Sequence, residues 1–142
     1  MGDNSRFTVL NLNSIETTKI KKIWEDSFVP IGIDRQKIPY EDMLWHIFSY
    51  KARECESGEQ ARNSFKDILK DNLYSFYLFH QYKNTGYIID NKFRTFSFDD
   101  LSQFIIDLET ADIYITDEQF NWTFVLTHED GWLGPYFCKR HR

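Results

Sequence analysis

Apolar residues recur along the chain with two periods, and the period predicts which segments form helices. Three segments carry the spacing of three or four residues that is typical of one helix face. The first begins at Asn13, which forms a possible capping box with Glu16, and ends before Pro30. The second begins at Ser57, with Gln60 in position for a capping box, and the third covers residues 100–109 with Asp99 as its cap.

Other segments alternate in polarity or form short aromatic and β-branched runs, which is typical of strands. They cover residues 6–12, 43–50, 73–81, 87–90, 112–116 and 121–128, with an edge strand expected at 134–138. An Asn-Thr-Gly sequence at 84–86 and the turn at 117–120 each favour a hairpin. Residues 51–56 are mostly charged and are expected to be exposed.

This element order predicts the α+β class, or α/β if the helical connections make parallel pairs. We expect a single mixed β-sheet of about five or six strands with three helices packed on it, in one domain over residues 1–142. The apolar stripes of the helices and strands also predict the core: Trp24, Phe48, Phe65, Phe76, Leu78, Phe104, Ile113, Ile115, Trp122 and Phe124.

Charge is distributed unevenly over the 142 residues, whose formal net charge is −5. Residues 95–138 contain nine acids and neither lysine nor arginine, whereas residues 1–94 are nearly balanced. An acidic region repels phosphate backbones, which disfavours nucleic-acid binding, and it can complement a basic protein partner. The alternative interpretation is a solvated surface that keeps the chain in solution.

The ends and the cysteines indicate a cytoplasmic protein. Met1–Ser5 lacks the pattern of a secretory signal, and no apolar stretch approaches the ~20 residues of a membrane span. Cys55 and Cys138 are therefore expected to be free thiols. Neither a CxxC pair nor a phosphate-binding or metalloprotease motif occurs, so we expect no metal and no cofactor.

Titratable and aromatic side chains gather in residues 127–137, where glycine and proline fix the shape of a loop. A pocket that joins His46 or His80 to His128 and Glu129 could bind a metal ion or carry acid–base chemistry, although a buried neutral histidine is the alternative for each. The candidate binding residues are His46, His128, Glu129, Trp132 and Tyr136. The alternative is that the two aromatic residues among them close one end of the core.

Three stretches resemble a family of small bacterial proteins, the domain-of-unknown-function family numbered 4275. They are LWHIFSYKARECESGEQARNSF, SFYLFHQ and DIYITDEQFNWTFVLTHEDGWLGPYF. The resemblance runs from about Trp24 to Phe137 and is most specific from Asp112 onward. In the family a cysteine often stands where this chain has Leu133, so a role of that thiol does not apply here. The resemblance implies a bacterial cytoplasmic domain and transfers no catalytic residue.

The sequence is consistent with two functions. A protein-binding or inhibitory module, such as an immunity-like protein that masks a basic partner, accounts for the small size and the acidic, aromatic composition. A small hydrolase that uses His128, Glu129 and His46 accounts for the polar cluster within an aromatic segment. A concave pocket that joins these groups would favour the enzyme, and a flat acidic-aromatic face would favour the binding module.

Overall fold

A seven-stranded antiparallel sheet forms the centre of the molecule, with strand order β1-β4-β3-β5-β6-β7-β2. The computed structural model describes residues 7–30, 32, 46–49, 53–71, 73–107, 110–127 and 135–140. The strands are β1 Thr8–Leu12, β2 Glu56–Ser57, β3 Ser75–His80, β4 Gly86–Asp90, β5 Ile113–Asp117, β6 Trp122–Leu126 and β7 Tyr136–Lys139. The helices are α1 Ser14–Phe28, α2 His46–Ser49, α3 Gly58–Lys70 and the 3-10 helix η1 Phe98–Phe104. The α+β class and the single sheet are confirmed. The expected mixed sheet of about five or six strands is corrected, because the described strands number seven and their pairs are all antiparallel.

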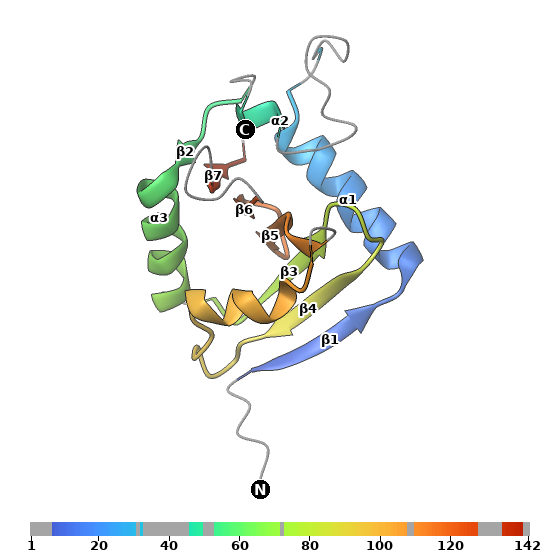
Figure 1. Cartoon of the computed structure of the whole chain (residues 1–142), viewed down its shortest axis with the longest axis vertical. Helices are drawn as coiled ribbons and strands as arrows, with labels where there is room; N and C mark the ends of the chain where they lie inside the picture. The colour runs from blue at the N-terminus through green and yellow to red at the C-terminus, as the bar shows by residue number, and fades with distance from the viewer. Residues whose placement is uncertain are drawn as a thin grey trace, which may run out of the picture.

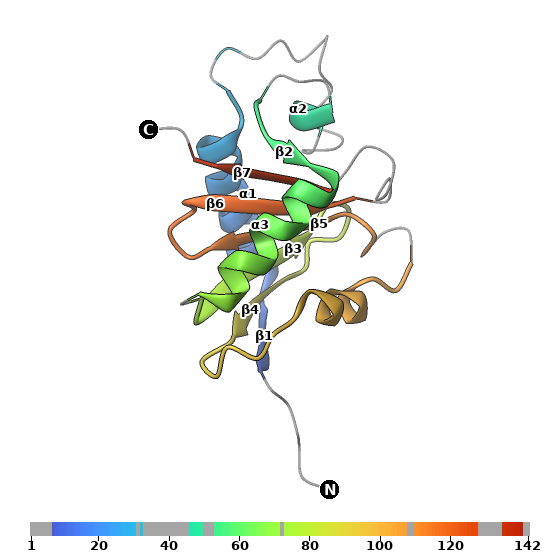
Figure 2. The same cartoon turned by 90° about the vertical axis from the view of Figure 1, so that its left-hand side faces the viewer.

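Helices cover both faces of this sheet (Figures 1 and 2). On one face, α3 and η1 pack on a cluster that includes Phe65, Phe124 and Ile115. On the other face, α1 and α2 pack on a cluster that includes Trp24 and Tyr114. Strands β5 and β6 are therefore buried on both sides, which explains why nearly every residue in them is apolar or threonine. All ten predicted core residues are buried.

The start of α1 follows from its local sequence. The Asn13 side chain accepts the backbone N–H of Glu16 at 2.8 Å, and the Glu16 carboxylate accepts that of Asn13 at 3.1 Å. This capping box confirms the prediction. The capping box predicted at the start of α3 was wrong, because Ser57 precedes this helix without a side-chain capping bond. Glu56 is held instead by the hydroxyl of Ser64, in the second turn of the helix.

The expected strand at 43–50 is wrong over the part that the structure describes. Residues 46–49 form the short helix α2, and the adjacent residues Ile47 and Phe48 are both buried in the α1-side cluster. The ring of Phe48 packs 5.4 Å from that of Tyr136. The sheet position beside β7 is occupied by β2, so this apolar run covers the α1-side cluster rather than extending the sheet.

The third helix was predicted in the wrong form and register. A 3-10 helix replaces the expected α-helix, and its start is fixed by Ser97, whose backbone N–H and hydroxyl both donate to Asp100 at 2.7 and 3.0 Å. The helix stops at Phe104 because the hydroxyl of Thr110 takes the backbone N–H of Ile106 at 2.7 Å. That bond replaces the next helical hydrogen bond and starts a turn.

Two smaller expectations also change. Residues 51–56 were expected to be exposed, yet Arg53 is only 6% exposed. Its guanidinium donates to the backbone carbonyl of Lys139, so it packs beneath the end of β7. Strand β7 was expected at the sheet edge, but β2 pairs with it from outside. The burial of Arg53 and the inner position of β7 have one cause: the chain before α3 returns to the sheet as the two-residue strand β2.

Candidate functional site

Two adjoining grooves run beside α3 and share Ile68 in their walls. They lie at the end of the sheet where β2, β3 and β6 begin and where β5 and β7 end. Figure 2 shows α3 crossing in front of these strands. The first groove, of about 620 Å³, lies between α3, β2 and β7; the second, of about 430 Å³, lies between the C-terminal turn of α3, the start of β3 and the β5–β6 turn. We call the pair the α3 groove.

Carboxylates dominate the walls of the α3 groove. The described residues that line it include six acids, Glu54, Glu56, Asp67, Asp71, Asp117 and Glu118, and one base, Lys139. None of these six carboxylates forms an ion pair within the described part of the chain. The groove therefore concentrates negative potential that the described residues leave uncompensated.

Neutral hydrogen-bond donors orient three of these carboxylates. The hydroxyl of Ser64 donates to Glu56, and that of Ser75 donates to Glu118. Asn121 donates its side-chain amide to Asp117 at 2.9 Å and its backbone N–H to the same carboxylate at 2.7 Å. Hydroxyl and amide donors fix the position of a carboxylate without cancelling its charge. These three carboxylates thus keep defined positions and can still bind a cation.

Aromatic rings supply the apolar part of the groove. Phe137 lines the first half, and Trp122 and Tyr74 line the second. The rings of Trp122 and Phe137 are stacked with centroids 6.0 Å apart, so the two halves share a continuous aromatic base. Tyr74 is 52% exposed, which places its ring at the surface. The groove can therefore contact the alkyl part of a side chain and its cationic end together.

The opposite flank of α3 carries positive charge. Lys66, Lys70 and Arg94 surround a pocket of about 310 Å³ whose lining includes Leu69 and Phe98. The ammonium of Lys66 lies 5.2 Å from the centre of the Phe98 ring. Helix α3 therefore separates an acidic flank from a basic one, so a charged partner can distinguish the two sides.

The residues predicted as a binding site fall mostly outside the described part. His128, Glu129 and Trp132 lie outside it, and of His46 only the backbone, in α2, is described. Tyr136 is described: it lies in β7, is 3% exposed and packs against Phe48. The structure therefore shows no two of these side chains together, and that site remains a prediction.

His80 is buried at the opposite end of the sheet from the α3 groove. It is 2% exposed, its ring lies 5.9 Å from that of Tyr87, and its Nδ1 has no hydrogen-bond partner among the described residues. Burial lowers its pKa from the ordinary value of 6.5, against a hydrogen bond with the backbone of Thr110 that raises it. His80 is therefore a neutral residue of the interior near pH 7.

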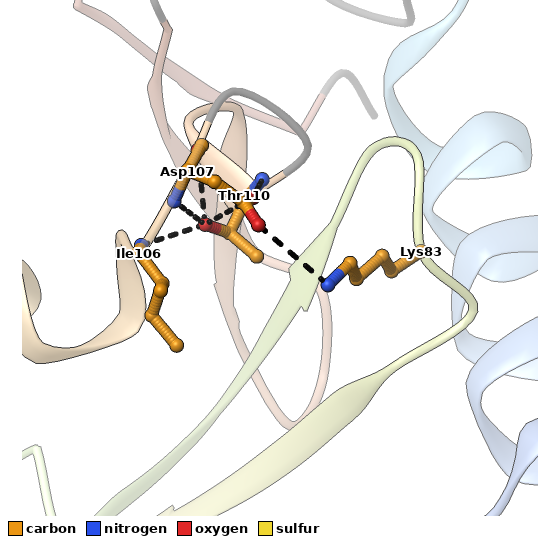
Figure 3. Close-up of polar contacts among 4 residues, drawn as sticks. All are labelled: Lys83, Ile106, Asp107 and Thr110. Atoms are coloured by element: carbon orange, nitrogen blue, oxygen red, sulfur yellow. Dashed lines mark hydrogen bonds and ion pairs between the residues drawn. The ribbon is translucent and has the colours of Figure 1, made fainter.

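Thr110, whose backbone has a hydrogen bond with His80, also binds the residues that follow η1 (Figure 3). Its hydroxyl oxygen accepts the backbone N–H groups of Ile106 and Asp107 at 2.7 and 3.0 Å. Figure 3 also shows Lys83 extending from the β3–β4 turn toward the Asp107 carboxylate, 4.0 Å away. Both partners of that ion pair are about half exposed, so it contributes little to stability.

A family model described as "Domain of unknown function (DUF4275)" matches residues 6–137. The chain belongs to this family. The DUF4275 match begins before β1 and ends within β7, so it includes the first six strands of the sheet, the start of β7 and all the described acids of the α3 groove. No curated protein and no solved structure matches the chain.

Sequence reasoning found only part of the acidic surface of this DUF4275 chain. The base-free stretch pointed to Asp117 and Glu118, but the other four acids of the α3 groove come from residues 54–71. A local signal was present, because Asp67, Ile68 and Asp71 follow Ser64 at three, four and seven residues and so share one helix face. The sequence could not predict that this face of α3 lies beside the β5–β6 turn.

Two features are absent from the described part of the chain. It contains no group of three or more His, Cys, Asp or Glu side chains that could hold a metal ion. Among the described helices, none has both the length and the apolar character needed to cross a membrane.

Proposed function

We propose that this DUF4275 chain is a protein-binding module whose α3 groove receives a lysine- or arginine-rich segment of a partner protein. The observation that carries the proposal is the set of six groove carboxylates that make no ion pair within the described residues, above a base of aromatic rings. We also propose an inhibitory role of the immunity type, because a module that covers the basic surface of its partner prevents that surface from binding other molecules.

Electrostatics favours a cationic partner in this groove. Like charges held close together repel one another, and the repulsion is stronger where protein walls displace water. A bound cationic side chain relieves that repulsion and gains charge-assisted hydrogen bonds. Its alkyl stem can meanwhile pack on the exposed ring of Tyr74 and on the small exposed edges of Trp122 and Phe137, so binding uses both the charge and the apolar surface.

We further propose that the protein works in the bacterial cytoplasm. Cys55 and Cys138 are both free, as predicted, and unpaired thiols are typical of a reducing compartment. The family resemblance supports a bacterial source. A cytoplasmic location also suits an inhibitor that neutralises a basic protein inside the cell.

Binding of a hexa-arginine peptide tests the proposal, with hexa-glutamate as the opposite-charge control. We expect the triple variant Asp67→Asn, Asp71→Asn, Glu118→Gln to lose at least about tenfold in affinity, since each rim charge contributes to a shared field. The matched control Glu25→Gln, Asp26→Asn, Glu59→Gln removes the same charge outside the groove and should change affinity less than about twofold. An equal loss in both variants would show non-specific charge attraction and overturn the proposal.

The site predicted at residues 127–137 has its own test. His128→Ala and Trp132→Ala should each reduce recovery of the partner in a pull-down while leaving the melting temperature unchanged. Lost stability with unchanged recovery would make both residues structural. The hydrolase alternative rests on His46, His128 and Glu129, none of whose side chains is described, and it is tested by measuring ester hydrolysis before and after His128→Ala.

A further inference from the structure

Cys55 directly precedes β2, and Cys138 lies within β7, the strand that pairs with β2. In the register of β2 and β7, Glu56 lies opposite Phe137 and Ser57 lies opposite Tyr136. One position further along the same register places Cys55 opposite Cys138. Residues that are far apart in the sequence thus become direct cross-strand neighbours.

The hydrogen-bond pattern identifies the type of this pair. The backbone N–H of Gly58 donates to the carbonyl of Pro135 at 2.9 Å, so Gly58 and Pro135 form a hydrogen-bonded pair. Hydrogen-bonded and non-hydrogen-bonded pairs alternate along an antiparallel ladder, so the two cysteines occupy a non-hydrogen-bonded position. The Cα atoms of such pairs lie about 4.5 Å apart. That separation lies within the range of about 4.4–6.8 Å that a disulfide spans.

Independent observations also place the two thiols together. Both cysteines line the first half of the α3 groove, and both pack in the cluster on the α1 side of the sheet. Burial raises the pKa of both thiols, and the Cys138 thiol lies close enough to Cys55 to raise the pKa of Cys55 further. The Arg53 guanidinium lies close enough to both thiols to oppose this rise, and Cys138 also has a hydrogen bond with it. The two cysteines therefore share one neighbouring cation as well as one ladder position.

We propose that Cys55 and Cys138 form a reversible disulfide when the thiol–disulfide balance around the protein becomes oxidising. The oxidant is a small disulfide of the glutathione class. The Cys55 thiolate, the more exposed of the two, attacks one sulfur of glutathione disulfide and releases one glutathione thiolate. The Cys138 thiolate then attacks the Cys55 sulfur and releases the second. The protein loses two protons and two electrons, and glutathione disulfide is reduced to two glutathione molecules.

The environment of the thiols makes this oxidation slow. Burial raises the pKa of Cys55 to about 12 and that of Cys138 to about 11. Because the thiolate is the attacking species, the dithiol form persists near neutral pH, and the rate of exchange should rise about tenfold per pH unit below these values. The pair thus responds to sustained oxidation rather than to brief changes.

The disulfide would fasten the weakest edge of the sheet. Strand β2 has two residues and forms the outer edge beside β7. A covalent bond at Cys55 holds this strand and the neighbouring groove acids Glu54 and Glu56 in place. It also constrains the unfolded chain by closing the long loop from residue 55 to residue 138, which stabilises the folded state. The inference does not depend on the proposed function of the groove.

Incubation of the full chain with glutathione disulfide in mildly alkaline buffer tests the proposal. We expect an intact mass lower by two hydrogens, a peptide map that joins the Cys55 and Cys138 peptides, and a melting temperature raised by about 10 °C. Dithiothreitol should reverse all three. The variants Cys55→Ser and Cys138→Ser should show neither the bond nor the rise.

Two results would overturn the proposal. One is a chain that carries glutathione on its cysteines without the internal bond. The other is an internal bond that forms only after denaturation, which would show that the folded register keeps the sulfurs apart. Cys55→Ser changes the more exposed residue, so it gives a folded control if Cys138→Ser fails to fold.

Discussion

A buried hydrogen bond from Trp24 connects α1 to the sheet and allows a quantitative test of the core. Trp24 is fully buried, and its indole N–H donates to the hydroxyl of Thr123 in β6 at 2.8 Å. That hydroxyl in turn donates to the backbone carbonyl of Ile115 in β5, also at 2.8 Å. The chain of bonds joins three elements, so Trp24→Phe should weaken their association without removing the aromatic ring.

The expected loss can be estimated from two contributions. The lost hydrogen bond contributes about 1 kcal/mol to the free energy of unfolding. Replacing indole by phenyl leaves about 40 Å³ unfilled, which costs about 1 kcal/mol at about 24 cal/mol per Å³. The Trp24 ring packs 5.2 Å from that of Tyr114 and 5.3 Å from that of Phe28, so few neighbours can move to fill the space. Trp24→Phe should therefore lower the free energy of unfolding by about 2 kcal/mol.

A double-mutant cycle with Thr123→Val isolates the hydrogen bond from the packing. Urea denaturation followed by far-ultraviolet circular dichroism gives the free energy of unfolding for the wild type, both single variants and the double variant. We expect a coupling of about 0.5–1.5 kcal/mol between the two positions. Single losses that add to within about 0.3 kcal/mol would refute the reasoning, because independent sites add in this way.

Three further predictions concern stability. Trp122→Ala should lower the free energy of unfolding by about 3–5 kcal/mol in urea denaturation, because its ring stacks on Phe137; a change near zero would mean that this face of β6 contributes no packing. Asn13→Ala should cost about 1 kcal/mol by removing the cap of α1, and Asn13→Ser should restore most of it, whereas equal losses would exclude the cap as the cause. Burial lowers the pKa of His80 from 6.5, so the unfolded chain binds its proton first as the pH falls. The contribution of neutral His80 to the free energy of unfolding is complete above about pH 6.5 and is lost as the pH falls below it. The urea midpoint of His80→Phe should therefore depend less on pH in that range than that of the wild type. An unchanged pH dependence would contradict the neutral state of His80 in the folded protein.

The sequence alone determined the features that depend on neighbours in the chain. The capping box of Asn13 and Glu16 needs only two side chains three residues apart, and it forms as predicted. The hairpin of β3 and β4 follows from the turn between them. The core residues were also predictable, because the period of apolar positions shows which side of each element must be removed from water. All these features have local physical causes.

The tertiary structure decided what depends on elements distant in the sequence. The apolar run at 43–50 predicted a strand, yet its described residues 46–49 form the helix α2, and β2 takes the place beside β7. The charge of Arg53 predicts exposure, but the carbonyl of Lys139 holds its guanidinium inside. The α3 groove likewise exists only because the fold brings Asp71 beside Glu118. Spacing along the chain fixes which face of an element is apolar, but the contact between two faces is chosen by the packing of the whole sheet, which no local pattern encodes.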